Sequence, residues 1–284
     1  MKLNIGIFAA AIAVILAPTG LFGQAQITTR REKIKDFTSK TTKVVMSGDE
    51  ILDEALREAV TTSWSLSPYE FCSKDEFNAL KTNAGHYFLL VVKGQEKKEY
   101  EPGIDLLTLV KGGPEAAKGI NEMLEVVSFP LRSAQLPSGR ELAVLPAIIK
   151  VMQDLTKTMT SSEMKAYSSL NSYNKNLGKI KNRQLYIPAE DIAPQVDGKT
   201  LGKLDQDIFI TDEDEVDDIL ARGAYNAVVS FVVAPADPVD GSVCYKMLFT
   251  ADTQELLYFK KHRISSRRGR GFLPDDLKEI KKAR

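Results

Sequence analysis

"CSKDEFNALKTNAGHYFLLVV" spans residues 72–92, and a stretch of the same design, "TDEDEVDDILARGAYNAVVSF", spans residues 211–231. Each contains, in order, a residue that can cap a helix, a short amphipathic pattern, a turn and an apolar run typical of a β-strand. The second stretch begins 139 residues after the first. This spacing predicts that one structural unit occurs twice in the chain.

The two stretches agree position by position. Ser73 coincides with Asp212 at this offset, and Glu76 coincides with Glu215. A serine or aspartate followed three residues later by glutamate is the pattern of a capping box at a helix start. The apolar residues that coincide are Tyr69 with Ile208, Phe71 with Ile210, Phe77 with Val216, Leu80 with Ile219, Leu89 with Val228 and Leu90 with Val229. The matches predict two copies of a β-α-β-β unit, and the alternative is convergent patterning within one larger α+β domain.

The rest of the chain predicts further elements. Strands are expected at residues 125–133 and 254–264, one at the end of each unit, and a helix is expected at residues 49–62. Two more helical patterns, at residues 141–159 and 163–180, would form a helical hairpin that bridges the units. The predicted class is α+β, and each unit is expected to form a small antiparallel sheet with helices on one face.

Composition is consistent with this organisation. The chain has 284 residues, of which 43% are hydrophobic, enough for two domains of ordinary size. Its 38 basic residues equal its 38 acidic ones, so no overall field favours nucleic acid as a partner. The expected segments are a signal peptide (1–25), an N-terminal linker (26–43), a first α+β unit (44–136), bridging helices (137–182), a second α+β unit (183–264) and a basic C-terminal tail (265–284).

The N-terminus predicts export. Lys2 precedes an uninterrupted apolar run at residues 5–17, and small residues follow at Gly23 and Ala25. This is the pattern of a secretory signal peptide cleaved after Ala25, or alternatively after Gly23. The other interpretation, an uncleaved anchor, is disfavoured because the run is too short for a hydrocarbon core about 30 Å thick. The mature protein is expected to be periplasmic or secreted, with no transmembrane segment after cleavage.

The cysteines and histidines do not predict a metal site. Cys72, Cys244, His86 and His262 are far apart in the sequence and lack the spacings of metal ligands. In an oxidising compartment the two cysteines could form a disulfide, or they could be two small buried side chains. No metal and no cofactor are therefore predicted.

One sequence pattern resembles a catalytic motif but has a structural explanation. Ser162 and Lys165 match the SxxK motif of penicillin-binding enzymes, and residues 172–174 match its SxN partner. The two motifs are so close that they would lie on one helix, whereas such enzymes bring them together from separate segments. Ser162 is better explained as a helix cap. A periplasmic hydrolase with an unrecognised active site stays the alternative function.

Two groups of residues are candidates for contact with a ligand or partner. Trp64 and Tyr69 belong to an aromatic cluster that could stack on a ligand, or form the buried face of a strand. Arg267, Arg268 and Arg270 belong to a basic stretch that could bind an anionic headgroup or an envelope protein, with a solvated tail as the alternative. No catalytic residue is predicted.

The stretches "ALREAVTTSWSLSPYEFC" (55–72), "AIIKVMQDL" (147–155) and "QLYIPAEDI" (184–192) also carry a resemblance. The chain resembles uncharacterised exported, periplasmic two-unit α+β proteins of Bacteroidetes-type bacteria, which have a helix followed by a strand of the W-x-(L/I)-x-P-Y-E-F type. The resemblance implies a fold but no reaction and no catalytic residues. The function expected from the sequence is a non-enzymatic binding or scaffolding module of the cell envelope.

Overall fold

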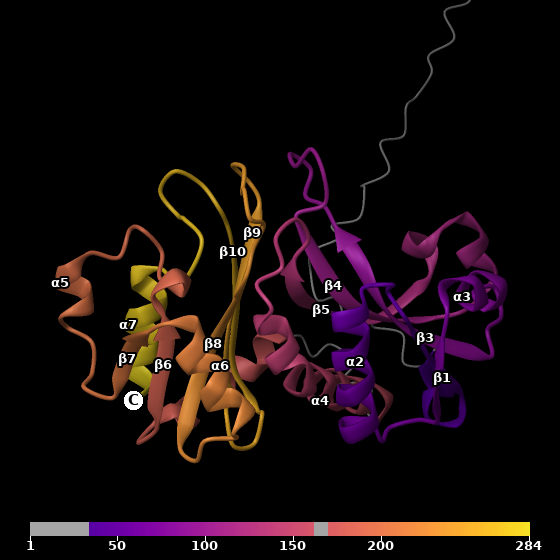
Figure 1. Ribbon diagram of the computed structural model, residues 1–284, viewed down its shortest axis with the longest axis horizontal. Coiled ribbons are helices and arrows are strands. Elements are labelled where there is room, and N and C mark those ends of the chain that lie inside the picture. The colour runs from indigo at the N-terminus through magenta and orange to yellow at the C-terminus, as the bar shows by residue number, and fades with distance from the viewer. Residues whose placement is uncertain (1–33, 162–169) are drawn as a thin grey trace, which may run out of the picture.

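The structure is a computed structural model, and it describes residues 34–161 and 170–284. It contains two five-stranded sheets with the orders β2-β1-β3-β4-β5 and β7-β6-β8-β9-β10 (Figure 1). The two orders are identical when the strands of the second sheet are renumbered from its first. This confirms the α+β class and the two similar units. The signal peptide (1–25) and the serine and lysine of the SxxK motif lie outside the described residues.

The elements of the first unit are η1 (Phe37–Ser39), β1 (Thr41–Val45), α2 (Glu50–Ser63), β2 (Tyr69–Cys72), α3 (Lys74–Leu80), β3 (His86–Gly94), β4 (Ile104–Lys111), η2 (Pro114–Lys118), η3 (Ile120–Glu122) and β5 (Leu124–Ser133), followed by α4 (Arg140–Ser161). The elements of the second unit are η4 (Leu170–Ile180), β6 (Gln184–Pro188), η5 (Ala189–Asp191), α5 (Gly198–Leu201), β7 (Ile208–Thr211), α6 (Glu213–Ala221), β8 (Ala227–Val233), β9 (Val243–Thr250), β10 (Leu256–Arg263) and α7 (Pro274–Ala283). Strands β4 and β9 have the same length and start 139 residues apart, as the sequence predicts.

The predicted helix starts are present, with one difference. Ser73 caps α3 in a complete capping box with Glu76. Asp212 caps α6 by accepting the backbone N–H of Glu215 at 2.8 Å, but the Glu215 carboxylate bonds the hydroxyl of Thr211 instead of returning to the cap. The second capping box is therefore only half formed, because a neighbouring hydroxyl takes the carboxylate.

The sheets are mixed, and the expectation of antiparallel sheets was wrong for part of each. Strand β1 pairs in parallel with β2 and β3, and β6 pairs in parallel with β7 and β8; the other pairs are antiparallel. Strand β1 falls partly in the segment 26–43 that was expected to be a linker. Parallel neighbours need crossover connections, and a right-handed crossover that moves one way across the sheet puts its helix on the opposite face from one that moves the other way. In the order β2-β1-β3 the second crossover reverses the direction of the first. Helices therefore cover both faces of each sheet, not one.

The two units stack through different faces. Helices α2 and α4 cover the face of the first sheet that points to the second unit, whereas α6 covers the facing side of the second sheet; all three share one core. Within that core, Phe129 of β5 lies 6.5 Å from Phe249 and 6.3 Å from Phe259, measured between ring centroids. Phe77 of α3 and Leu277 of α7 belong to separate cores on the two outer faces. Figure 1 shows this succession of layers along the longest axis.

The segment 137–182 bridges the units through α4, which lies in the shared core. Its described second part, η4, is a 3-10 helix and not the expected α-helix. Asn174 in η4 donates to the backbone oxygen of Phe259 at 3.0 Å and accepts its N–H at 2.7 Å. Helix η4 thereby satisfies backbone groups on the free edge of β10, which would otherwise be open for pairing with another strand.

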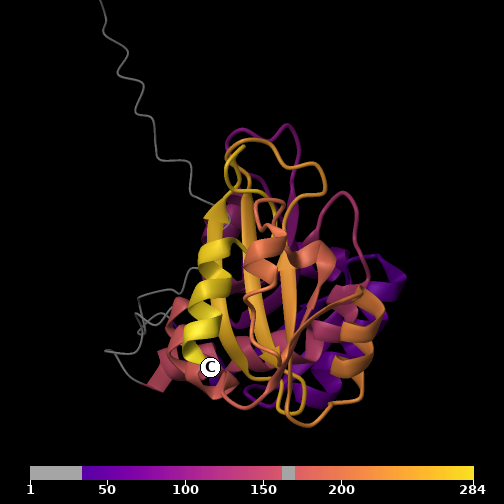
Figure 2. The ribbon, with the colours of Figure 1, turned by 90° about the vertical axis from the view of Figure 1, so that its left-hand side faces the viewer.

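Residues 265–284 do not form a solvated tail. Helix α7 packs across the outer face of the second sheet, where Leu277 and Ile280 are buried (Figure 2). The helix begins at Pro274 and has two acidic residues in its first turn, and both features favour a helix N-terminus. The glycine- and arginine-rich composition before it suggested flexibility, but the apolar residues Phe272 and Leu273 anchor that connection.

Among the described helices, none combines the length and the apolar character that crossing a bilayer would require.

Candidate functional site

The most unusual buried group of the second unit is a lysine. Lys246 of β9 has a side chain only 1% exposed, on the face of the sheet that α7 covers. Its ammonium group forms an ion pair with Asp276 in the first turn of α7. Lys260 of β10 lies directly opposite Lys246 in the antiparallel register, with its Nζ 3.3 Å from Oδ1 of Asp276. One carboxylate thus holds two lysines that would otherwise repel each other.

Asp276 is held by two further donors. The Tyr258 hydroxyl donates to Oδ1 at 2.9 Å, and the Leu273 backbone N–H donates to Oδ2 at 2.9 Å. Burial alone would raise the pKa of Asp276, but the charge and hydrogen bond of Lys246 hold this pKa below its usual value. Burial lowers the pKa of Lys246, and Asp276 opposes that shift. Each member of the pair therefore stabilises the charged form of the other.

A cavity of about 330 Å³ opens beside this pair. Its lining residues come from the loop between η5 and α5, from β9, β10, the connection to α7 and the start of α7: Gln195, Lys246, Lys260, Lys261, Arg267, Arg268, Leu273, Pro274, Asp275 and Asp276. Five of these residues are cationic and two are acidic. The cavity therefore has a positive field that would attract an anion.

The two arginines of the lining differ from its lysines Lys246 and Lys260 because they have no acidic partner among the described residues. Lys246 and Lys260 are paired with Asp276, and Lys260 also reaches Glu279 at 2.7 Å. Arg267 and Arg268 are exposed, and within residues 34–161 and 170–284 neither side chain forms an ion pair. Their guanidinium groups remain as donors for an external partner.

The repeat supplies an internal comparison for these positions. The offset of 139 residues places Leu107 of β4 on Lys246. Leu107 lies opposite Phe129 in the first sheet, just as Lys246 lies opposite Lys260 in the second. Leu107 and Phe129 are fully buried apolar residues of the shared core. Two charged residues therefore occupy a place in the second unit where the same fold accepts a hydrocarbon pair.

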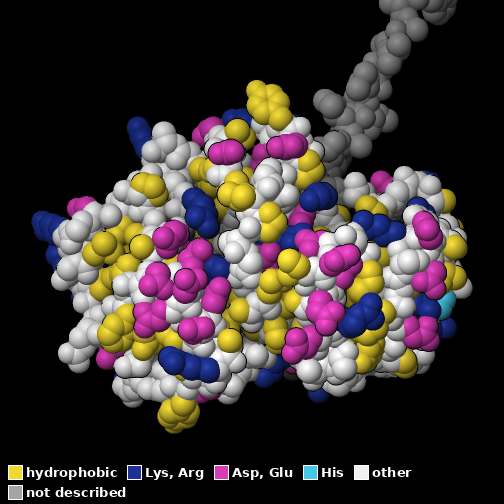
Figure 3. Space-filling view, viewed as in Figure 1, with side chains coloured by type: hydrophobic (Ala, Val, Ile, Leu, Met, Phe, Trp, Pro, Cys, Tyr) yellow, Lys and Arg dark blue, Asp and Glu magenta, His cyan; other side chains and the backbone are white. Residues whose placement is uncertain are grey.

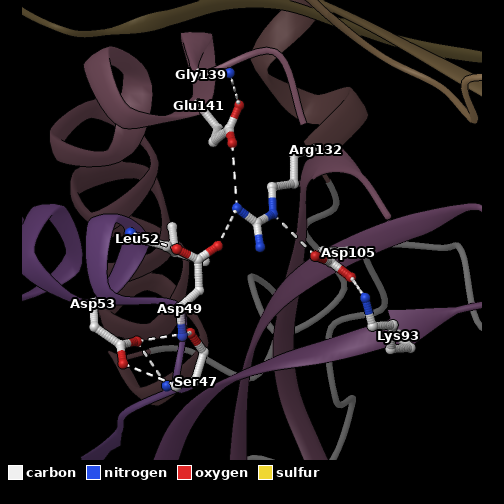
Figure 4. Close-up of polar contacts among 10 residues, drawn as sticks. Ser47, Asp49, Leu52, Asp53, Lys93, Asp105, Arg132, Gly139 and Glu141 are labelled. Carbon is white, nitrogen blue, oxygen red and sulfur yellow. Dashed lines mark hydrogen bonds and ion pairs between the residues drawn. The ribbon is translucent and has the colours of Figure 1, made fainter. Parts of the chain in front are cut away.

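The corresponding corner of the first unit is a closed ion-pair network (Figure 4). The Nε of Arg132 on β5 lies 3.0 Å from Oδ2 of Asp105, and its Nη1 lies 3.0 Å from Oδ2 of Asp49. Glu141 in the first turn of α4 is 3.4 Å from Nη1 of Arg132 and also accepts the N–H of Gly139 at 3.0 Å. Lys93 pairs with the other oxygen of Asp105 at 3.0 Å, so three carboxylates face two cations, and all of them have partners.

A second buried arginine joins the two units. Arg140, at the start of α4, donates from Nη2 to the backbone oxygen of Ser230 at 2.8 Å and from Nη1 to Asp191 at 3.3 Å. It also lies 3.5 Å from Glu213 and 3.4 Å from Asp217 of α6. Burial raises the pKa of both α6 carboxyls, although Arg140 opposes the shift. Figure 3 shows acidic side chains gathered over the α6 side of the second unit, around this junction.

The structure separates the five contact residues chosen from the sequence. Trp64 is buried, and its Nε1 donates to the backbone oxygen of Ser67 at 3.1 Å. Tyr69 is half-buried on the edge strand β2, packed edge-on against Phe71 with ring centroids 5.7 Å apart. Neither aromatic side chain lines the cavity.

The basic residues of the tail divide differently. Arg267 and Arg268 line the cavity, whereas Arg270 donates to the backbone oxygen of Glu190 at 3.4 Å and does not line it. Lys246 and Lys260 were missed from the sequence, because each lies inside an apolar strand pattern. The offset that revealed the repeat contained the signal, since it places Lys246 on a core leucine.

Cys72 and Cys244 are free, buried thiols in the structure. They belong to the cores on the two opposite outer faces of the molecule. Burial raises the pKa of Cys244 to about 11 and also raises that of Cys72. Both therefore have the environment of small hydrophobic side chains, not of reactive thiols.

Comparison with protein-family models, with curated proteins and with solved structures found no match to this chain. In the described part of the chain, no three histidine, cysteine or acidic side chains converge as metal ligands would. Function is therefore argued from the geometry of the cavity beside α7.

Proposed function

We propose that the protein is an exported, non-enzymatic binding module of the cell envelope and that it binds anionic groups in the cavity beside α7. The observation that carries the proposal is the pair Lys246 and Lys260, which replaces a hydrocarbon pair of the first unit. A buried charge is costly, and ion pairs of this kind give little net stability compared with apolar packing. Binding of an external anion would explain why the protein has this pair of lysines in place of apolar residues.

The lining residues support binding more than catalysis. They include no serine, cysteine or histidine that could serve as a nucleophile or general base. The oxygens of Asp276, the most buried carboxylate of the lining, are taken up by Lys246, Lys260, Tyr258 and Leu273. A carboxylate engaged in this way is a poor proton acceptor, because each donor stabilises its ionised form.

The location in the envelope is supported by the N-terminal pattern, in which Lys2 precedes the apolar run at residues 5–17. The proposed anion binding also gives a role to the basic C-terminal residues Arg267 and Arg268, which line the cavity as part of the folded protein. The cationic lining of the cavity supports an anionic headgroup as the partner, as the sequence also suggests.

The proposal can be tested by calorimetric titration of the full chain with tripolyphosphate. Binding should weaken at least tenfold in the double variant R267Q/R268Q, because each lost charge-assisted contact is worth about 1.5–3 kcal/mol. The matched control is R222Q, which removes an exposed arginine of the α6 C-terminus. Equal affinity of R267Q/R268Q and R222Q would contradict the proposed site.

A further inference from the structure

The proposed function leaves the chemical class of the anion open. Resting on that function, we infer that the cavity beside α7 binds a phosphomonoester carried on a sugar-sized or headgroup-sized molecule. The inference depends on the number and geometry of the donors, on the charge of the lining and on the space around them.

The donors suit a phosphate group better than a carboxylate. Arg267 and Arg268 each present a planar fork of N–H donors, the geometry that matches phosphate oxygens in pairs. Lys260 adds an ammonium group whose side chain is 41% exposed. A carboxylate has two oxygens to offer to these donors, whereas a phosphomonoester has three.

The charge of the lining suits a dianion. Five cationic residues face two acidic ones, so a surplus of positive charge remains in the cavity. A phosphomonoester carries a charge of about −1.5 to −2 at neutral pH, whereas a sulfate ester or a carboxylate carries one negative charge. The dianion therefore brings the cavity closer to neutrality.

The helix start does not itself provide the binding site. Asp276 already accepts the backbone N–H of Leu273, and Pro274 at the first helical position has no N–H. The ligand's phosphate would therefore bind to the arginine and lysine side chains and not to the backbone of α7. This makes the side-chain variants decisive tests.

The cavity has room for more than a phosphate group. Its volume of about 330 Å³ corresponds to roughly ten water molecules at ~30 Å³ each, whereas a phosphate group fills only part of this space. The remaining wall includes Gln195, Leu273 and Pro274, an amide beside apolar surface. Gln195 uses its Oε1 to accept the N–H of Gly269 at 2.9 Å, which leaves its amide hydrogens for ligand hydroxyls.

The test compares three ligands that differ only in the anionic group: glucose 6-phosphate, glucose 6-sulfate and glucuronate, titrated into the full chain at pH 7.5. Glucose 6-phosphate is expected to bind at least about tenfold more tightly than the other two, a difference of about 1.4 kcal/mol. Lowering the pH to 5.5 should weaken only this ligand, because its second proton binds with a pKa near 6. R267Q/R268Q should abolish the preference, and R222Q should keep it.

Vesicles distinguish a free phosphomonoester from a lipid one. Phosphatidic acid carries a phosphomonoester and phosphatidylglycerol a diester, so sedimentation with vesicles of each tests the same chemistry on a membrane surface. Preference for phosphatidic acid, or for glucose 6-phosphate, would support the inference and identify the source. Equal binding of all anions would overturn the inference but leave the proposed function standing. Binding of none would overturn both.

Discussion

Each unit has a cluster of charged side chains where its last strands meet the start of the following helix, and the two clusters differ in their balance of charge. We call these places the first corner and the second corner. In the first unit, Arg132 sits among Asp49, Asp105 and Glu141, so acidic groups are in excess and all have partners. In the second unit, Asp276 sits among cations, and Arg267 and Arg268 remain beside an open cavity. In both, a carboxylate in the first turn of the following helix bonds a backbone N–H and a strand cation.

The difference follows from what covers each corner. Units that stack through different faces leave the first corner near the unit junction and the second on the outer face. At the junction, every charge must find a partner within the chain, because desolvated groups without partners are costly. On the outer face the cavity is open to solvent, so water can hydrate the exposed side chains of Arg267 and Arg268 and they need no partner within the chain. The comparison teaches that two similar units can distribute charge differently according to whether other elements of the chain cover the charged groups.

The largest expected effect is the loss of Asp276. D276A would leave Lys246 buried without its counter-ion and directly opposite Lys260, and removing one partner of a buried pair costs about 3–5 kcal/mol. Guanidinium unfolding of the full chain measures this loss. D275A is the control, since Asp275 is exposed and should change the unfolding free energy by less than about 0.5 kcal/mol. Similar costs for both variants would contradict the role of Asp276 as the hub.

A smaller but still large effect is expected at the first corner. R132M should lower the unfolding free energy by about 2–4 kcal/mol, because it removes the common partner of Asp105 and Glu141. The cost is lower than for D276A since Asp105 keeps Lys93 at 3.0 Å and Glu141 keeps the N–H of Gly139. The same denaturation assay applies. A loss below about 1 kcal/mol would show that this network does not stabilise the first unit.

The smallest effect concerns pH. The cross-strand pair Asp105 and Arg132 of the first unit corresponds to Cys244 and His262 of the second. Burial lowers the pKa of His262, and the charge of Lys246 lowers it further. The folded protein therefore binds this proton less readily than the unfolded chain does, so the contribution of His262 to stability is full above the unfolded pKa of about 6.5 and is lost as the pH falls below it.

H262Q keeps a donor for the backbone oxygen of Gly269, which His262 contacts at 2.8 Å, but it cannot take up a proton. Its unfolding free energy should fall less than that of the wild type between pH 7 and pH 5. Urea unfolding at several pH values in this interval measures the two slopes. Identical slopes would show that His262 is not responsible for the pH dependence.

Much of the fold could be predicted from the sequence, because the repeat depends on local patterns. Capping residues and apolar periodicity placed α3, α6 and the strands that follow them, and the same offset aligned β4 with β9. Strand β1 was missed, since its five residues "TTKVV" give too short an alternation to stand out. Parallel pairing was missed for a different reason. Which strands become neighbours depends on contacts between distant segments, and a local pattern does not record them.

The candidate site was only partly predictable. Arg267 and Arg268 stood out by composition, but Lys246 and Lys260 come from two strands and meet Asp276 only when α7 folds onto the sheet. No local pattern encodes that meeting. Composition also suggested a mobile tail, whereas the packing of α7 is determined by apolar residues spaced three apart, Leu277 and Ile280.

The most direct test gives positions 246 and 260 of the second unit the apolar character of Leu107 and Phe129 in the first unit. The variant K246L/K260F/D276N keeps an amide oxygen that can accept the backbone N–H of Leu273, and Y258F is added so that no hydroxyl loses its partner. It should stay within about 2 kcal/mol of wild-type stability, because apolar replacement of a buried ion pair is often neutral. Melting temperature is measured with and without glucose 6-phosphate at constant ionic strength. Wild type should be stabilised by about 2.7 kcal/mol at a hundred times the Kd, and the variant by less, because it keeps Arg267 and Arg268 but lacks the ammonium group of Lys260. Equal stabilisation of both proteins would contradict an anion site at this corner.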